Sequence, residues 1–291
     1  MNFYVDLNPE IKIKDAYSVK DELIRFRDEY PLAEIFDINA IIVPLRMIKS
    51  KYEVSQIKEA IHLTKKGLEE VFEKIEVGLY EYQLKAMFEY TVKSNANVLL
   101  AFPSIVATSG NATILHYHEA HSKVENEDLV LFDVGSRSNN VYCGDISRTV
   151  PANGKFNPLQ KSIYETVLSC NKYIISLVKP GKTLNELNLD AQQYLKTECV
   201  KKGLLKENED IRRVFPHGVS HHLGLDTHDM AGKYINKNSP LVAGNVITVE
   251  PGLYFEEHKI GVRIEDDILV TERSCENLSR DIPKEIIDIE K

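Results

Sequence analysis

The chain has 291 residues, of which 43% are hydrophobic and 27% charged, so it can form one large domain or two smaller ones with a sizeable core. Its formal net charge is −8, which argues against a nucleic-acid partner because such proteins usually carry a basic face. The sequence contains no apolar run of about 20 residues, so no membrane span is expected.

The first fifty residues predict a small unit of strand and helix. Residues 2–7 are typical of a strand, residues 18–29 of a helix, and residues 45–53 of a connection to the rest of the chain. The opening MNFYVDLNPE has neither the basic nor the apolar region of a secretory signal. We therefore expect a cytoplasmic protein.

Four longer helices are predicted, in two pairs. Apolar residues at helical spacing place them around residues 57–75, 84–92, 159–177 and 187–195. Two of these helices have a capping box before them, at Ser50–Glu53 and at Thr183–Glu186. β-rich segments follow each pair. This alternation predicts an α+β layout with a pseudo-repeat, in which helices cover one face of a curved sheet.

The cysteines and the charge runs receive ordinary structural interpretations. The four cysteines form no Cys-x-x-Cys pair, so we expect reduced thiols rather than a zinc ribbon, although an even count also allows disulfides in an exported protein. A run of charges usually lies on a solvated face. We expect this for the acidic tail at residues 281–291, and it is also the ordinary interpretation of Asp266 and Asp267.

Five candidate metal ligands lie in separate motifs. They are Asp133 in LVLFDVG, Asp145 in CGDISRT, His221 in FPHGVSHH, Glu250 in VITVEPGLY and Glu265 in IGVRIEDD. Four carboxylates and one imidazole suit hard divalent ions better than soft ones. Four anions at one point would repel each other or take up protons, whereas two divalent ions would balance them. Two metals about 3.5–4 Å apart can make a nucleophile and bind a developing oxyanion.

Strand parity gives these acids defined directions. Because side chains alternate along a strand, Asp133 shares a face with Leu131, and Glu265 shares a face with Arg263. Each acid lies at or near the end of an apolar, β-rich segment. An unpaired carboxylate is costly to bury in such a segment, so these acids need partners.

The five motifs, in this order, resemble those of the prolidase and aminopeptidase P family of pita-bread dinuclear metallopeptidases. The resemblance runs from about Tyr52 to the C-terminus. It implies an α+β pita-bread fold, with a curved, mostly antiparallel sheet covered by two helix pairs in a pseudo-two-fold repeat. It also implies a catalytic domain at residues 51–291. Residues 1–50 would be the remnant of a larger N-terminal domain and its linker, most of which we expect to be missing.

The resemblance also implies a role for each residue that matches a family motif. The implied metal ligands are Asp133, Asp145, His221, Glu250 and Glu265. The implied catalytic residues are Glu250, His116, His217, His228, Arg263 and Tyr254. Glu250 would act both as a ligand and as the general base. The three outer histidines would hold the substrate and the tetrahedral intermediate.

Two departures from the family pattern lie close to these residues. Asp145 follows Asp133 by 12 residues, one more than the family pattern, and we expect the extra residue in the turn-like run at residues 136–140. His222 stands where many relatives carry an aromatic residue, so we expect a change in the pocket wall. Neither departure removes a ligand.

The activity that the resemblance implies is hydrolysis of the N-terminal Xaa-Pro bond of peptides by attack of a metal-bridging hydroxide. The expected cofactors are two divalent metal ions, with Mn²⁺ first and Co²⁺ or Zn²⁺ also allowed by the ligands. The expected partners are peptides with proline at the second position. Assembly into a homo-oligomer is left open.

Several alternatives share part of this pattern. An Xaa-Pro dipeptidase, or prolidase, has the same five ligands, although HGVSHHLGLD is closer to the aminopeptidase form. A methionine aminopeptidase differs in its histidine segment. A non-catalytic pita-bread binding protein typically lacks ligands, and all five are present here. A short N-terminus could also leave a folded but inactive catalytic half.

Overall fold

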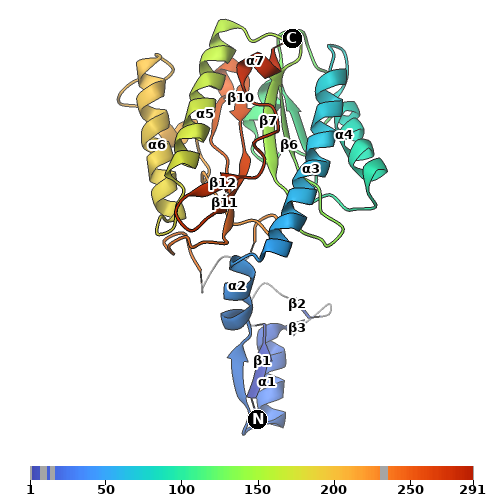
Figure 1. Cartoon of the computed structure of the whole chain (residues 1–291), viewed down its shortest axis with the longest axis vertical. Coiled ribbons are helices and arrows are strands. Elements are labelled where there is room, and N and C mark those ends of the chain that lie inside the picture. The colour runs from blue at the N-terminus through green and yellow to red at the C-terminus, as the bar shows by residue number, and fades with distance from the viewer. Residues whose placement is uncertain (1, 7–11, 14–16, 230–234, 291) are drawn as a thin grey trace.

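The molecule consists of a slender N-terminal part and a larger body, which helix α2 (Asn39–Met47) connects (Figure 1). The computed structural model describes residues 2–6, 12–13, 17–229 and 235–290. Within these residues, no helix is long and apolar enough to cross a membrane.

The N-terminal part is built from short strands around one helix. Its elements are β1 (Asn2–Val5), β2 (Lys12–Ile13), β3 (Tyr17–Ser18), α1 (Val19–Glu29) and β4 (Glu34–Asp37). Strands β1 and β4 pair in parallel, and the ring of Phe3 meets that of Phe26 edge to face at 4.6 Å. The strand predicted at residues 2–7 is β1, with residue 7 outside the described residues, and the helix predicted at residues 18–29 is α1.

Two helix pairs form the helical layer of the body. They are α3 (Lys51–Lys74) with α4 (Glu81–Asn95), and α5 (Pro158–Leu177) with α6 (Leu184–Lys201). Helix α3 begins at the predicted capping box, because Ser50 Oγ accepts from Glu53 N–H and the Glu53 carboxylate accepts from Ser50 N–H. Thr183 and Glu186 cap α6 in the same way. These bonds satisfy N–H groups that a helix leaves unpaired in its first turn.

The strands of the body pair antiparallel and form two half-sheets and a hairpin. Their bounds are β5 (Ile105–Thr108), β6 (Leu129–Val134), β7 (Ile146–Pro151), β8 (Val246–Val249), β9 (Gly252–Phe255), β10 (Ile260–Arg263), β11 (Asp266–Val270) and β12 (Cys275–Asn277). One half-sheet has the order β5-β6-β7, the other β12-β11-β8, and β9 pairs with β10. The N–H of Glu265 donates to the Ser147 carbonyl at 3.0 Å and joins the halves. Short helices complete the body: η2 (Ser109–Thr113), η3 (Ile211–Arg213), η4 (Glu256–His258) and α7 (Ile286–Ile289).

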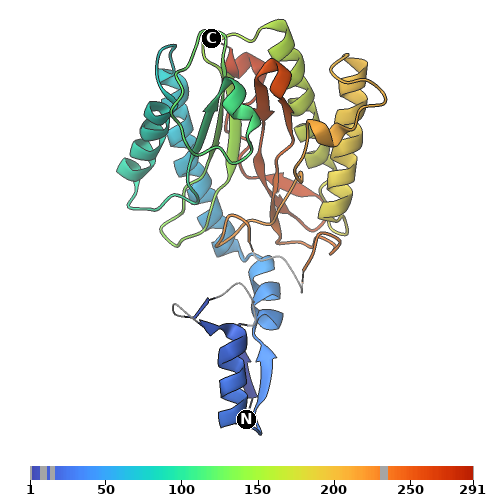
Figure 2. The ribbon, with the colours of Figure 1, turned by 180° about the vertical axis from the view of Figure 1, so that it is seen from behind.

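The helix pairs and the strands form the layers that the sequence predicts. Helices α3 and α4 lie beside β6 and β7, and α5 and α6 lie beside the C-terminal strands, as both views show (Figures 1 and 2). The main core lies between helices and strands and includes Phe88, Phe132 and Tyr164. A smaller cluster contains Ile105 and Leu131, the residue predicted to share a face with Asp133. The predicted α+β pita-bread layout is confirmed.

The acidic C-terminal tail is not a solvated surface element, so that prediction is wrong. Ile282 and Ile289 are buried in the main core. The carbonyls of Ile282 and Pro283 accept hydrogen bonds from the buried guanidinium of Arg148. Apolar residues placed between acidic ones therefore anchor this segment, because their burial outweighs the tendency of the charges to stay in water.

Candidate metal centre

Each predicted ligand lies at a strand end or next to one. Asp133 is in β6, Asp145 precedes β7, Glu250 follows β8, and Glu265 lies between β10 and β11. His221 lies beside β8, where the N–H of Thr248 donates to its carbonyl at 2.9 Å. Ends of strands from both half-sheets therefore meet at one place. All five side chains line a single cavity of about 960 Å³.

The β6–β7 hairpin brings two of these acids to the cavity. A Cβ atom at Gly135 would lie 2.1 Å from the carbonyl oxygen of Gly144, so glycine is required for the two arms to approach. Ser136 Oγ donates to the Ala60 carbonyl of α3 at 2.7 Å and fixes the hairpin to the helix layer. The turn between these strands is expected to be one residue longer than in the family pattern, yet Asp133 and Asp145 still line the same cavity.

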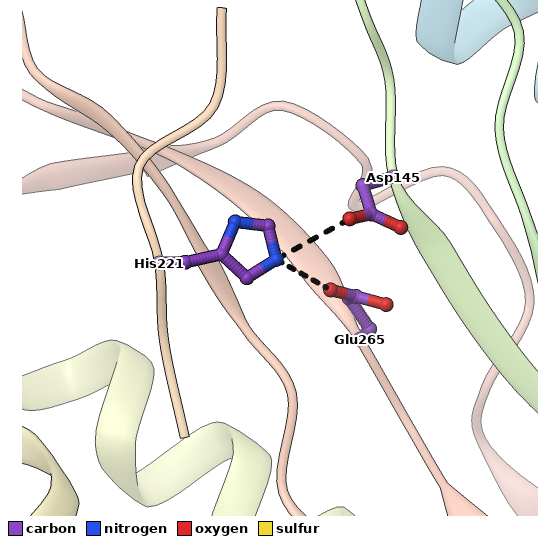
Figure 3. Close-up of side chains that lie close together, drawn as sticks. All are labelled: Asp145, His221 and Glu265. Carbon is purple, nitrogen blue, oxygen red and sulfur yellow. Dashed lines mark ion pairs between the residues drawn. The ribbon is translucent and has the colours of Figure 1, made fainter. Parts of the chain in front are cut away.

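His221 stands at the centre of the carboxylates. Its Nε2 lies 3.3 Å from Asp145 Oδ2, 3.6 Å from Glu250 Oε1 and 3.9 Å from Glu265 Oε1. One potential ligand atom from each of Asp145, His221 and Glu265 lies within 4.8 Å of the others (Figure 3). Strands and loops far apart in sequence thus supply a compact group of ligand atoms.

The hydrogen bonds around His221 leave potential ligand atoms of this group facing one another. His221 Nδ1 lies 3.1 Å from the His222 carbonyl, which can only accept, so Nδ1 donates. Its Nε2 faces carboxylate oxygens of Asp145, Glu250 and Glu265. Glu265 Oε1 is buried and has no hydrogen-bond donor among the described residues. Acceptors facing acceptors need a proton or a metal ion between them.

The raised pKa values of three of the acids also indicate that the cluster lacks positive charge. Burial, followed by the charge of Asp133, raises the pKa of Asp145 well above its usual range. Burial and Asp145 raise the pKa of Glu265 in the same way. Burial also raises the pKa of Glu250, against the opposing effect of His221. These residues fit divalent ions, because cations would let the carboxylates stay charged where burial and mutual repulsion disfavour it.

Asp133 differs from the other acids because a protein cation meets it. Its Oδ2 accepts from Arg263 Nη2 at 2.6 Å. Arg263 Nε donates to Ser147 Oγ at 2.9 Å, and Ser147 Oγ donates to Glu265 Oε2 at 2.8 Å. Arg263 and Glu265 therefore lie on the same side, as predicted. The arginine fixes one edge of the cluster while leaving the other oxygens free for ligation.

A second chain of hydrogen bonds runs from Arg263 to His217. Arg263 Nη1 donates to the hydroxyl of Tyr254 at 2.8 Å, and that hydroxyl lies 2.9 Å from His217 Nε2. His217 Nδ1 lies 2.8 Å from the carbonyl of Gly218, so Nδ1 is the donor and Nε2 accepts from Tyr254. Burial, followed by Arg263, lowers the pKa of His217 to about 3, and burial raises that of Tyr254 to about 12. Both groups are neutral at physiological pH.

The remaining two histidines line the same cavity. The ring of His228 packs edge to face on that of His221, with centroids 4.3 Å apart, and burial lowers its pKa. His116 is exposed and lines the cavity. His118 is exposed and lines the cavity as well. The structure therefore gathers all the predicted site residues.

Sequence reasoning missed several residues that support the site. Asp267 is fully buried, and its Oδ2 accepts from the N–H of Asp145 at 3.1 Å. Asp266 is also fully buried, so the usual interpretation of a charge run fails for both. Their only signal is an acidic doublet that follows an apolar strand. Ser147 has no sequence signal beyond its position two residues after Asp145.

Comparisons with known proteins agree with this geometry. Residues 55–272 match metallopeptidase family M24. The chain is 35% identical to the Xaa-Pro aminopeptidase of Haemophilus influenzae over 97% of its own length and 34% identical to that of Escherichia coli over 89%. A structure from Bacillus anthracis, assigned as an aminopeptidase P, superposes with a TM-score of 0.92 at 42% identity, covering 99% of this chain and 68% of that one. A structure of E. coli aminopeptidase P with the inhibitor Pro-Leu gives a TM-score of 0.86 at 31% identity, covering 95% and 68%.

The fold and the acidic centre define a metallopeptidase of the pita-bread class. The chain belongs to metallopeptidase family M24, as the resemblance predicts. It spans 67% of the length of the H. influenzae relative and 62% of the E. coli relative, so it is shorter than both. The division into a remnant at residues 1–50 and a catalytic domain at residues 51–291 stays a prediction.

Proposed function

We propose that this protein is a dinuclear-metal aminopeptidase that hydrolyses the N-terminal Xaa-Pro bond of peptides. The observation that carries the proposal is the cluster of buried acids around His221 Nε2, in which Glu265 Oε1 has no hydrogen-bond donor among the described residues. The names of the relatives, Xaa-Pro aminopeptidases, support the choice of substrate. So does the inhibitor Pro-Leu in the E. coli structure. We also propose a cytoplasmic location.

Asp133, Asp145, His221, Glu250 and Glu265 would hold two divalent ions. Bound divalent ions would supply Lewis acidity toward the scissile carbonyl and would acidify a water molecule. We propose Mn²⁺ as the native metal. Zn²⁺ and Co²⁺ suit the same ligands, and a zinc-substituted E. coli aminopeptidase P structure exists.

Glu250 is the residue that handles the proton in this proposal. Burial raises the pKa of its carboxyl group, so its basicity lies closer to neutral pH than that of an exposed glutamate. It would take the proton of the attacking water and transfer it to the prolyl nitrogen, which has no N–H and must gain a proton to leave. The proposal thus assigns one carboxylate to both proton transfers.

Two histidines bind the developing oxyanion and the substrate in this proposal. His228 and His116 line the cavity, and a ring N–H there can donate to the carbonyl oxygen as it becomes negative. Arg263 and His217 line the same cavity, and the hydroxyl of Tyr254 connects them by hydrogen bonds. These residues would hold the peptide in place for attack.

A matched peptide series tests this function. We expect the full chain with Mn²⁺ to cleave an Xaa-Pro-Xaa tripeptide and to leave the matched Xaa-Ala-Xaa tripeptide intact. Activity should vanish with a chelator and return with metal. Faster cleavage of an Xaa-Pro dipeptide would favour the dipeptidase instead. A chain that binds no metal and cleaves none of these peptides would contradict both activities and favour a binding protein.

A further inference from the structure

The segment that joins the N-terminal part to the body makes buried ion pairs beside the candidate metal centre. Lys49 Nζ donates to Asp229 Oδ2 at 2.9 Å, and Arg46 Nη2 donates to Asp229 Oδ1. The side chains of Lys49 and Asp229 are each 1% exposed, so water does not screen this pair. Arg46 also reaches Asp226 at 2.7 Å. We call Arg46, Lys49 and Asp229 the linker clamp.

The linker clamp has little freedom to shift. The N–H of Lys49 donates to the Gly244 carbonyl at 2.8 Å and fixes the linker backbone to the body. A Cβ atom at Gly224 would lie 2.3 Å from Asp229 Oδ2 and 3.0 Å from Lys49 Cε, so the loop backbone packs directly on the ion pair. Such close packing fixes positions to a fraction of an ångström.

Asp229 connects the linker clamp to two histidines of the site. Its N–H donates to the His222 carbonyl at 2.9 Å, and the same carbonyl accepts from His221 Nδ1 at 3.1 Å. His228 precedes Asp229 in the chain and packs its ring on that of His221. A displacement of Asp229 would therefore move His228 directly and His221 through the shared carbonyl.

We propose that Arg46 and Lys49 are positioning residues of the catalytic site. By holding Asp229, they fix the loop at residues 224–229 and, with it, the ring of His228. The kinetic consequence rests on the proposed function, whereas the structural link is a property of this chain alone.

The proposal changes the expected extent of the catalytic unit. Arg46 and Lys49 lie before the family match at residues 55–272 and on the N-terminal side of the predicted boundary at residue 50. The linker is then part of the catalytic machinery. A change in the N-terminal part that moves α2 would reach His228 through the same ion pairs.

Lys49→Met is the most informative substitution. Methionine replaces the aliphatic stem of lysine and removes only its ammonium group, and Asp229 keeps Arg46 as a cation, so the buried carboxylate is not left unpaired. The matched control is Lys58→Met in α3, which removes an exposed lysine paired with Glu276 at 2.8 Å. Both variants are made in the full chain.

The first measurement needs no activity. Hydrogen exchange of the full chain, measured by mass spectrometry, should be about tenfold faster in residues 222–229 of Lys49→Met than in the wild type. The reason is that the hydrogen bond from the Asp229 N–H to the His222 carbonyl opens more often. Exchange in α5 and α6 should be unchanged, and Lys58→Met should match the wild type throughout. Unchanged exchange at residues 222–229 would overturn the proposal.

The second measurement asks whether the effect passes through His228. We expect Lys49→Met to lower kcat about tenfold with KM nearly unchanged, because a misplaced group affects the transition state more than substrate binding. In a His228→Ala background the same substitution should cost less than about threefold, since the positioned ring is already gone. An equal loss in both backgrounds would show that the effect does not pass through the ring of His228 and would overturn the proposal. If the wild type cleaves no Xaa-Pro peptide, the proposed function fails, and the exchange measurement alone decides the structural link.

Discussion

Glu265 and Asp266 are neighbours in the chain and both are buried, yet they belong to clusters with opposite charge balance. Asp266 meets Arg148 at 2.9 Å and also pairs with Lys284, and these cations lower its pKa although burial alone would raise it. Glu265 faces other acids, and burial together with Asp145 raises its pKa well above the usual range. The protein's own charges complete the first cluster, whereas the second needs a cation from outside.

The alternation of side chains in this strand-like segment explains how one segment serves both clusters. Successive residues point to opposite faces, so Glu265 reaches the cavity while Asp266 reaches Arg148 and the C-terminal segment. Arg148 also donates to the Glu265 carbonyl at 2.6 Å. The balanced cluster thus holds the backbone from which the unbalanced cluster presents a ligand.

The largest expected effect comes from a substitution in the acidic cluster that faces the cavity. Glu250→Gln removes the proposed proton acceptor, and we expect kcat to fall by about 10²–10⁴-fold at saturating metal. The control is Glu256→Gln, an exposed glutamate in η4, which should leave kcat unchanged. Steady-state kinetics on an Xaa-Pro-Xaa tripeptide measures both. Wild-type turnover in Glu250→Gln would remove this residue from the mechanism.

The next effect compares Glu265 and Asp266 by the free energy of unfolding of their variants. In the metal-free chain, Asp266→Asn leaves Arg148 and Lys284 without their carboxylate, and we expect a loss of about 3–5 kcal/mol in the free energy of unfolding. Glu265→Gln removes a repelled charge and should leave that free energy unchanged or higher. Urea unfolding at pH 8 compares the two variants. Equal losses would mean that both acids are paired within the protein.

The stability of the variants at Glu265 and Asp266 should also depend differently on pH. A raised pKa means that the folded state binds the proton more tightly, so the stability linked to Glu265 is present below its ordinary pKa near 4.3 and is lost as pH rises through the raised value. The advantage of Glu265→Gln over wild type should therefore grow by about 1–2 kcal/mol between pH 5 and pH 8 without metal. Asp266 has a lowered pKa, so the cost of Asp266→Asn should stay constant over that range. Urea midpoints with a chelator test this, and an advantage that shrinks with pH would contradict the assignment.

The smallest expected effect concerns the hydrogen bonds of Tyr254 beside the acids. Tyr254→Phe removes the hydroxyl between Arg263 and His217, and we expect kcat/KM to fall about tenfold, the worth of one hydrogen bond to a charged group. Tyr82→Phe, an exposed tyrosine in α4, is the control. A loss as large as that of Glu250→Gln would show that Tyr254 takes part in the chemistry itself.

Local signals in the sequence predicted the helices well, and they drew attention to the five acidic and histidine motifs. The capping boxes at Ser50 and Thr183 mark the starts of α3 and α6, because the bonds they make lie within four residues. The acidic motifs stand out because each acid interrupts an apolar, β-rich segment, where it needs a partner, and the structure places these acids around one cavity. Family resemblance, rather than periodicity, supplied the order and the roles.

The supporting contacts could not be predicted because they join distant residues without a local pattern. Lys49 and Asp229 are 180 residues apart, and Arg148 and Asp266 are 118 apart. No spacing rule connects the partners of these pairs. Each of them is a charged residue of a kind that usually lies on the protein surface. The C-terminal tail was wrongly assigned for the same reason, since its acidic composition hides the two isoleucines that anchor it.

Metal stoichiometry tests the central claim most directly. Isothermal titration of the metal-free full chain with Mn²⁺ at neutral pH should show two ions bound per chain in the wild type. In Asp145→Asn and Glu265→Gln, which alter two proposed ligands that lie next to His221, binding of at least one ion should be lost. A wild-type chain that binds no Mn²⁺, or variants that bind it as the wild type does, would contradict the account.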